Sequence, residues 1–241
     1  MTRILLVVQD KGGVGKSLTT RALAEAVPEA PVIEVDASQR LIELKERVTF
    51  FPMRADRTAI DLSGGKAARA EFDGVITAIQ KATKPTVIDV GANTSASLMS
   101  VLGSLSDAFA AMEIELGVVV LVTAEPGALA EAPRMMMLAK PLQATRFLIE
   151  NRLHGEVDPK SIEKIADGAT VTTLAEHAME DRAVAVLQAG GLASIPKLDI
   201  AKLIDRHGLA LGSRVHGDLK RLRADAMVAV LPAAEWLVGQ P

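Results

Sequence analysis

Uninterrupted apolar runs, each bounded by turn residues, recur along the chain. Such runs are typical of strands that are covered on both faces, as in a parallel sheet. The pattern predicts strands at Ile4–Val8, Pro31–Val35, Thr86–Val90, Val118–Val122 and Arg146–Ile149, and a short sixth strand at Leu192–Ile195.

Segments of helical length, rich in alanine and leucine, lie between these runs. They predict helices over Lys66–Lys81, Ser95–Ala111, Ala128–Leu138 and Ile162–Leu187. The alternation of strands and helices predicts right-handed crossovers, and therefore an α/β fold, a three-layer sandwich with a mostly parallel central sheet. Ligands of such folds bind at the carboxyl ends of the strands, so the residues that follow each run are the candidates for a site.

A glycine-rich loop follows the first predicted strand and precedes a helix-prone segment; it reads Asp10-Lys11-Gly12-Gly13-Val14-Gly15-Lys16-Ser17. Glycines let the backbone approach phosphate groups closely with its N–H groups pointing inward, and the helix adds the positive end of its dipole. We expect Lys16 to neutralise the β and γ phosphates and the Ser17 hydroxyl to hold Mg²⁺. The order of strand, loop and helix therefore predicts a nucleoside triphosphate site.

The loop departs from the G-x-x-x-x-G-K-[ST] pattern, because Asp10 stands in place of the first glycine and Lys11 is a second lysine. The run from Lys11 to Ser17 resembles the deviant Walker A motif of the ParA/MinD superfamily of ATPases, which are P-loop NTPases of the SIMIBI type. A carboxylate beside phosphates is electrostatically unfavourable unless it pairs with a cation such as Lys11, so the role of Asp10 stays open.

The resemblance implies that Lys11 acts in trans, reaching the partner's phosphates in a nucleotide-sandwich homodimer, and that the bound molecules are ATP and Mg²⁺. The loop residues that it implies for nucleotide binding are Gly12, Gly13, Val14, Gly15, Lys16, Ser17 and Leu18.

The second predicted strand ends in the acidic pair Glu34 and Asp36, two positions apart. This stretch resembles the second motif of the superfamily. In that family the second acid orients the attacking water and contacts the Mg²⁺ shell, roles that a carboxylate near a metal and a γ-phosphate can perform. The alternative is an aspartate that caps the next helix. Ala37 and Ser38 stand in place of the proline-containing continuation that is usual in the superfamily.

The third predicted strand ends in Asp89, with Gly91 two positions later, which is a Walker B pattern. We expect Asp89 to accept a hydrogen bond from Mg²⁺-bound water or from Ser17, and Gly91 to offer its N–H to the γ-phosphate. Asn93, Thr94 and Ser95 would cap the following helix.

Strand five is followed by Asn151 and Arg152, which resemble the superfamily position that reads adenine. An asparagine amide can pair with both a donor and an acceptor of the base edge. Pro196 resembles the last strand end of the superfamily, whose backbone lines the base pocket. The absence of an N-K-x-D guanine signature also favours ATP over GTP. A structural loop asparagine is the alternative.

Composition excludes several classes of protein. The 241 residues are 49% hydrophobic and no linker divides them, so we expect a single P-loop ATPase domain over residues 1–241. Cysteine is absent, which excludes disulfides, thiolate metal sites and cysteine nucleophiles. No apolar run approaches the roughly 20 residues of a membrane span, and no signal peptide is apparent, so we expect a cytoplasmic protein.

A net charge of −3 gives no overall basic field, so DNA contact would need a local patch. The candidate patch is Arg214, His216, Lys220, Arg221 and Arg223. Nonspecific DNA binding is possible there, but Asp218 and Asp225 favour a solvated helix face. The four histidines lack metal-ligand spacing, and the run Met135–Met137 is expected to pack in the core. The stretch Met227–Val238, interrupted by Pro232, is a poor membrane-surface helix.

These features predict a Mg²⁺-dependent ATPase that works as a nucleotide-driven dimerisation switch in partition, positioning or conjugative transfer. The resemblance also implies a protein partner that stimulates hydrolysis. Two alternatives stay open: an ATP-dependent ligase resembling dethiobiotin synthetase, and a scaffold that binds nucleotide without hydrolysing it.

Overall fold

The computed structural model describes residues 1–53 and 66–240. Within them, seven strands form one sheet in the order β3-β2-β4-β1-β5-β6-β7, and every neighbouring pair is parallel. The strands are β1 (Thr2–Val8), β2 (Val32–Asp36), β3 (Val48–Pro52), β4 (Thr86–Val90), β5 (Ile114–Val122), β6 (Thr145–Asn151) and β7 (Thr170–Leu174). The predicted parallel α/β fold is confirmed.

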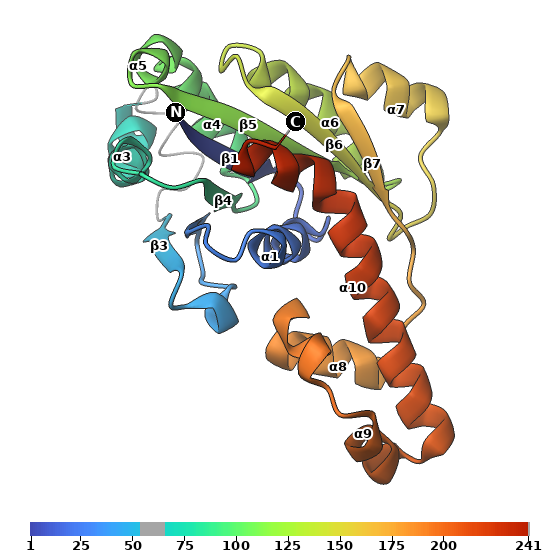
Figure 1. The fold of residues 1–241 in the computed structure, drawn as a ribbon. Coiled ribbons are helices and arrows are strands. Elements are labelled where there is room, and N and C mark those ends of the chain that lie inside the picture. Colours follow the sequence, from blue (N-terminus) through green and yellow to red (C-terminus); the bar gives the residue numbers. More distant parts are fainter. Residues whose placement is uncertain (54–65, 241) are drawn as a thin grey trace.

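Helices cover both faces of the sheet (Figure 1). On one face lie α3 (Lys66–Gln80), α4 (Ser95–Gly103), α5 (Ser106–Ala111), α6 (Pro126–Ala139) and α7 (Pro159–Ala166). The other face is covered by α1 (Lys16–Ala26) and α10 (Leu209–Val238). Farther from the sheet, α8 (Asp181–Gly190), the 3₁₀ helix η2 (Leu192–Lys197) and α9 (Ile200–His207) pack against these two helices and one another. A short 3₁₀ helix, η1 (Ile42–Leu44), follows β2.

Alternate residues of the central strand enter different cores. Ile4, Leu6 and Val8 belong to the cluster beneath α3 to α7, whereas Leu5 and Val7 belong to the cluster beneath α1 and α10. All five are fully buried. Because both faces of β1 are covered, every position favours an apolar residue, which explains the uninterrupted run in the sequence.

The two edge strands, β3 and β7, were not predicted. Both are half-exposed along much of their length, and β7 reads Thr-Val-Thr-Thr-Leu. An edge strand is covered less completely and needs no continuous apolar run. The predicted helix Ile162–Leu187 is also wrong, because the unpredicted strand β7 lies within it. The segment runs from α7 through β7 into α8. Gly168, at φ +82°, separates α7 from β7.

The predicted strand Leu192–Ile195 is also wrong, because this segment lies within the 3₁₀ helix η2. Leu192 and Ile195 are both buried and stand three positions apart, which is the repeat of a 3₁₀ helix. The predicted helix Ser95–Ala111 is divided at Ser104 and Leu105 into α4 and α5.

Helix α10 passes through Pro232 without ending, so the predicted interruption is wrong. Proline removes the hydrogen bond to the carbonyl four residues earlier. That residue is Val228, which is 67% exposed, so water can satisfy the freed carbonyl. The first half of α10 extends away from the sheet beside α8 and α9 (Figure 1).

Among the described residues, no helix combines the length and the apolarity that crossing a bilayer requires.

Candidate functional site

A cavity of about 310 Å³ opens at the carboxyl end of the sheet, where the loop between β1 and α1 meets the ends of β2 and β4. It is lined by Gly12, Gly13, Gly15, Lys16, Ser17, Leu18, Asp36, Arg40, Asp89, Val90 and Ala92. The strand order places β4 between β1 and β2, which brings the three predicted motifs to one place. Asn151, Arg152 and Pro196 do not line this cavity.

The conformation of the glycine-rich loop requires two of its glycines. Gly13 and Gly15 have φ of +80° and +98°, in the left-handed region. A Cβ atom on Gly15 would also lie 2.6 Å from Nδ2 of Asn151. A side chain at this position would therefore strain the backbone and displace a buried neighbour.

Lys16 is buried at the mouth of this loop. Its ammonium donates to the carbonyl oxygens of Gln9 at 2.7 Å and Lys11 at 3.2 Å. Burial lowers the pKa of Lys16, and the nearby carboxylates of Asp89 and Asp36 oppose this shift. Phosphate oxygens carry more charge than peptide carbonyls, so an entering phosphate would be a stronger acceptor for the same ammonium.

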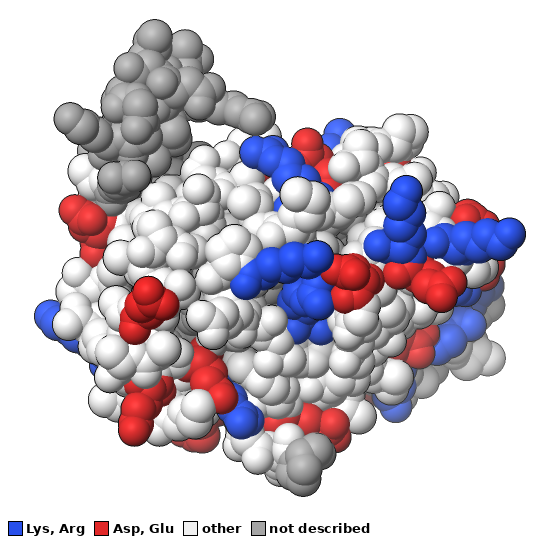
Figure 2. Space-filling view, turned by 90° about the horizontal axis from the view of Figure 1, so that it is seen from above, with Lys and Arg blue, Asp and Glu red and all other residues white. Residues whose placement is uncertain are grey.

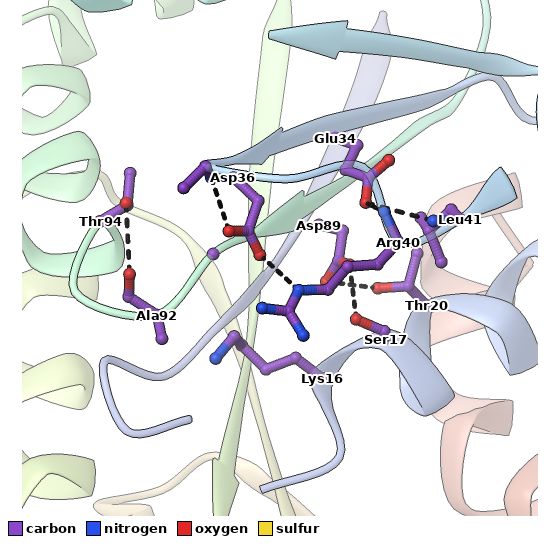
Figure 3. A network of polar contacts seen from close by, with 12 residues as sticks. Lys16, Ser17, Thr20, Glu34, Asp36, Arg40, Leu41, Asp89, Ala92 and Thr94 are labelled. Atoms are coloured by element: carbon purple, nitrogen blue, oxygen red, sulfur yellow. Dashed lines mark hydrogen bonds and ion pairs between the residues drawn. The ribbon is translucent and has the colours of Figure 1, made fainter. Parts of the chain in front are cut away.

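Asp89 joins the end of β4 to the first turns of α1. Its two carboxylate oxygens accept hydrogen bonds from Ser17 Oγ at 3.1 Å and Thr20 Oγ1 at 3.0 Å (Figure 3). Burial raises the pKa of Asp89, with the hydroxyl groups of Thr20 and Ser17 and the charge of Lys16 acting in the opposite direction. A hydroxyl and a carboxylate in contact are hard oxygen ligands, which suits Mg²⁺ coordinated jointly by protein and phosphate.

Asp36 faces the same cavity from the end of β2. Its Oδ2 accepts a hydrogen bond from Arg40 Nε at 3.0 Å, and its Oδ1 accepts one from the Ala37 N–H at 2.6 Å (Figure 3). Gly91 passes directly beside it, because a Cβ on Gly91 would lie 2.7 Å from Asp36 Cγ. The Gly91 N–H, which we expected to serve a γ-phosphate, here donates to Val35 O at 2.7 Å.

Asp10 contacts the loop and helix after β4. Its Oδ1 accepts a hydrogen bond from the Ala96 N–H at 3.3 Å, at the start of α4, and Oδ2 lies 3.8 Å from Arg134 of α6. The Asp10 carbonyl accepts from the Asn93 N–H at 3.0 Å. Asp10 therefore links the glycine-rich loop to the segment after β4. Its charge is paired with that of Arg134 rather than that of Lys11.

Lys11 pairs with Glu125, the N-cap residue of α6, at 2.7 Å. The two side chains are 42% and 34% exposed, so this is a surface ion pair. Lys11 thus lies beside this cavity without lining it.

Asn151, Arg152 and Pro196 lie at the ends of β6 and η2. Asn151 is buried, and its Nδ2 donates to the carbonyl of Val14 in the glycine-rich loop at 3.0 Å. Arg152 pairs with Glu150 at 3.1 Å and with Glu156 at 2.5 Å. Asn151 is therefore in contact with the loop, and Arg152 is held by two carboxylates.

Three residues at this site were not predicted from the sequence. Gln9 is fully buried and donates to the carbonyls of Leu121 and Ala128, which fixes the start of the loop. Thr20 follows Ser17 by three positions, so helical spacing alone places both hydroxyls on one face, a signal that was available. Arg40 follows the second acidic motif without any recognisable pattern.

The basic residues of α10 are largely paired. Arg214 contacts Glu180, Arg221 contacts Asp218, and Arg223 contacts Glu25. Figure 2 shows a different face, seen from above the view of Figure 1, where several Lys and Arg side chains also stand beside Asp and Glu side chains. The ion pairs of the α10 residues are typical of a solvated helix face.

Within the described ranges, no cluster of histidine, aspartate and glutamate could hold a metal ion by itself.

Comparison with known proteins supports the fold. The sequence matches no family model and no curated protein. The structure is similar to that of a Cyanothece McdA variant in complex with ATP, with a TM-score of 0.51 and 13% identity over 100% of this chain and 97% of that one. MinD cell division protein from Aquifex aeolicus has a TM-score of 0.46 and 13% identity over 92% and 98% of the two chains. The McdA similarity confirms the predicted fold of ParA/MinD-type P-loop ATPases.

Proposed function

We propose that this chain is a Mg²⁺-dependent ATPase of the ParA/MinD type and that ATP drives it to form a homodimer. One observation carries the proposal: Lys16, Ser17, Asp36 and Asp89 surround a single cavity at the mouth of a glycine-rich loop. A buried ammonium, a hydroxyl and two carboxylates are the groups that hold a triphosphate together with its cation.

Each residue of the cavity has a defined task in this proposal. Lys16 exchanges its two carbonyl acceptors for phosphate oxygens. Ser17 and Asp89 hold Mg²⁺, which, when bound, neutralises charge on the phosphates. Asp36 orients the water that attacks the γ-phosphate, once its oxygens are free of the contacts to Arg40 and Ala37.

Lys11 carries the dimerisation step of the proposal. Its ion pair with Glu125 is half-exposed, and such pairs contribute only about 0–1 kcal/mol. The phosphates of a second subunit would compete successfully with one carboxylate for this ammonium. Two triphosphates placed face to face repel each other, so a dimer needs cations between them.

Adenine recognition by Asn151 and Arg152 is also part of the proposal. Asn151 contacts Val14 and lies close to Gly15, so it stands beside the loop that would hold the phosphates of the nucleotide. Its amide oxygen remains an acceptor while its Nδ2 donates to Val14. Pro196 would line the base from η2.

The cellular roles that we propose are partition, positioning or conjugative transfer, with a protein partner that stimulates hydrolysis. The similarity to a Cyanothece McdA variant in complex with ATP supports a role that depends on ATP.

Light scattering with ATP and Mg²⁺ tests the dimerisation switch. We expect Asp36→Ala, which should bind ATP without hydrolysing it, to form dimers at tens of micromolar, and we expect Asp36→Ala with Lys11→Ala to remain monomeric. A monomeric Asp36→Ala protein that binds ATP would contradict the switch. Dimers that persist without Lys11 would contradict only the role of that lysine.

Phosphate release from the parent chain separates an ATPase from a scaffold that only binds nucleotide. We expect release that Lys16→Ala abolishes. ATP binding by the parent with no release above the Lys16→Ala background would contradict hydrolysis.

A further inference from the structure

Arg40 brings a second cation into the phosphate cavity. It lines the cavity together with Lys16 and Ser17, and its guanidinium lies between Asp36 and the glycine-rich loop (Figure 3). Its Nε donates to Asp36 Oδ2 at 3.0 Å, and the side chain is 59% exposed. Among the described residues, this is the only hydrogen bond of the guanidinium, so its two terminal nitrogens retain their donors.

The backbone of Arg40 is held from two sides. Its N–H donates to the buried Oε1 of Glu34 at 2.5 Å, and the Leu41 N–H donates to the same oxygen at 3.2 Å. The carbonyl of Arg40 accepts from Arg21 Nη2 of α1 at 2.9 Å. The backbone is therefore anchored while the guanidinium remains free to turn within the cavity.

The surroundings of Arg40 give its guanidinium a choice of two acceptors. Asp36 is one, and the terminal phosphate of a bound nucleotide would be the other, because Arg40 lines the same cavity as Lys16 and Ser17. A guanidinium binds phosphate through two parallel hydrogen bonds. Only a triphosphate would bring a third phosphate group into this cavity, which Asp36 and the glycine-rich loop both line.

We propose that Arg40 senses the γ-phosphate and gives the site its preference for nucleoside triphosphate over diphosphate. In the structure it is paired with Asp36. With a triphosphate bound, its guanidinium turns to the γ-phosphate, and the Asp36 carboxylate is released at the same moment. This inference rests on the proposed function, because it assigns a further residue to the same nucleotide site. Glu34 acts as a positioning residue that holds the backbone of Arg40.

Isothermal calorimetry with Mg²⁺ tests this role, with a non-hydrolysable ATP analogue and ADP as the two ligands. Arg40→Ala should weaken binding of the analogue by about tenfold or more, the loss expected for charge-assisted hydrogen bonds, and should change ADP binding by less than about twofold. Arg40→Lys, which keeps the charge but loses the planar fork, should give an intermediate ratio of the two affinities. Arg182→Ala, at an exposed position of α8, removes one positive charge elsewhere and should leave the ratio unchanged.

The possible outcomes separate this inference from the proposed function. An Arg40→Ala protein that binds the analogue and ADP in the parent's ratio overturns the role of Arg40 and leaves the nucleotide site standing. Tighter binding of both ligands by Arg40→Ala also overturns it, since Arg40 would then only obstruct the cavity. A parent chain that binds neither ligand overturns both proposals.

Discussion

The proposed phosphate side and the proposed base side of the candidate site are built from different kinds of interaction. On the phosphate side, Lys16, Asp36 and Asp89 carry charges that three neighbouring segments bring around one cavity. On the base side, Asn151 contributes a neutral amide that already contacts the loop backbone, and Pro196 lies in a 3₁₀ helix. Phosphate binding demands charged groups and glycines, whereas a base can be held by neutral amides and backbone. The residues of the phosphate side can therefore be recognised in the sequence, whereas those of the base side hardly can.

The largest expected effect lies on the phosphate side. Lys16→Ala removes the cation of the loop and should weaken ATP binding by about a hundredfold or more, as expected for the loss of two charge-assisted hydrogen bonds. Calorimetry with Mg²⁺ measures this. Lys11→Ala is the matched control, because it removes a lysine of the same loop that does not line the cavity, and it should bind ATP as a monomer. An affinity of Lys16→Ala within about threefold of the parent would refute the phosphate site.

Asp36→Ala should separate binding from hydrolysis on the same side. We expect phosphate release to fall by about a hundredfold while the affinity for ATP stays within a few-fold of the parent, because the carboxylate acts on water. Single-turnover phosphate release and calorimetry measure the two quantities. Equal losses in both would make Asp36 a structural residue.

Asn151→Ala should have a smaller effect, confined to the base side. It removes one neutral hydrogen-bonding group, so ATP affinity should fall by about three- to tenfold, and the preference for ATP over GTP should weaken. Competition binding measures both. A parent chain that ranks GTP with ATP would contradict adenine recognition. An Asn151→Ala protein that loses ATP and GTP equally would leave Asn151 only its contact with Val14.

Glu34→Gln should produce the smallest effect, a change in the pH dependence of stability. Burial raises the pKa of Glu34 above its ordinary 4.5, and Asp89 and Asp36 add to this against the two backbone hydrogen bonds. Because the folded chain holds this proton more tightly than the unfolded chain, the contribution to stability is present below pH 4.5 and is lost as the pH rises through the folded pKa.

Urea unfolding between about pH 4 and pH 7 tests this sign. The free energy of unfolding of the parent should fall relative to Glu34→Gln as the pH rises. Glu46→Gln, at an exposed position, should follow the parent. If the difference in the free energy of unfolding between the parent and Glu34→Gln does not vary with pH, Glu34 has the same pKa in the folded and the unfolded chain, and the prediction is wrong.

The same contrast explains how much of the fold could be predicted. Strands buried on both faces, such as β1 and β4, consist mostly of apolar residues and were predicted correctly. The edge strand β7 is largely exposed and contains three threonines, so its sequence pattern did not distinguish it from the helices beside it. For η2, two buried residues at the ends of a short, mostly apolar segment fit a strand and a 3₁₀ helix equally well.

The motif residues of the site could be predicted from their types, but the ion-pair partners of some of them could not. Lys16, Ser17 and Asp89 meet as their motifs indicate. The partners of Asp10 and Lys11 could not be predicted, because Arg134 and Glu125 lie more than a hundred positions later, and only the folded sheet brings α6 beside the loop.

The last turns of α10 provide an optical probe. Trp236 is the only tryptophan of the chain, which has no tyrosine. Its ring lies over Gly117, where a Cβ would come within 2.4 Å, and its centroid is 6.1 Å from that of Phe147 and 5.4 Å from the Arg3 guanidinium carbon. Indole fluorescence therefore reports on one place, where α10 covers the early part of β5. Since the phosphate cavity is at the other end of the strands, an emission change on adding nucleotide would mean that occupancy of the cavity is transmitted along the sheet to its far end.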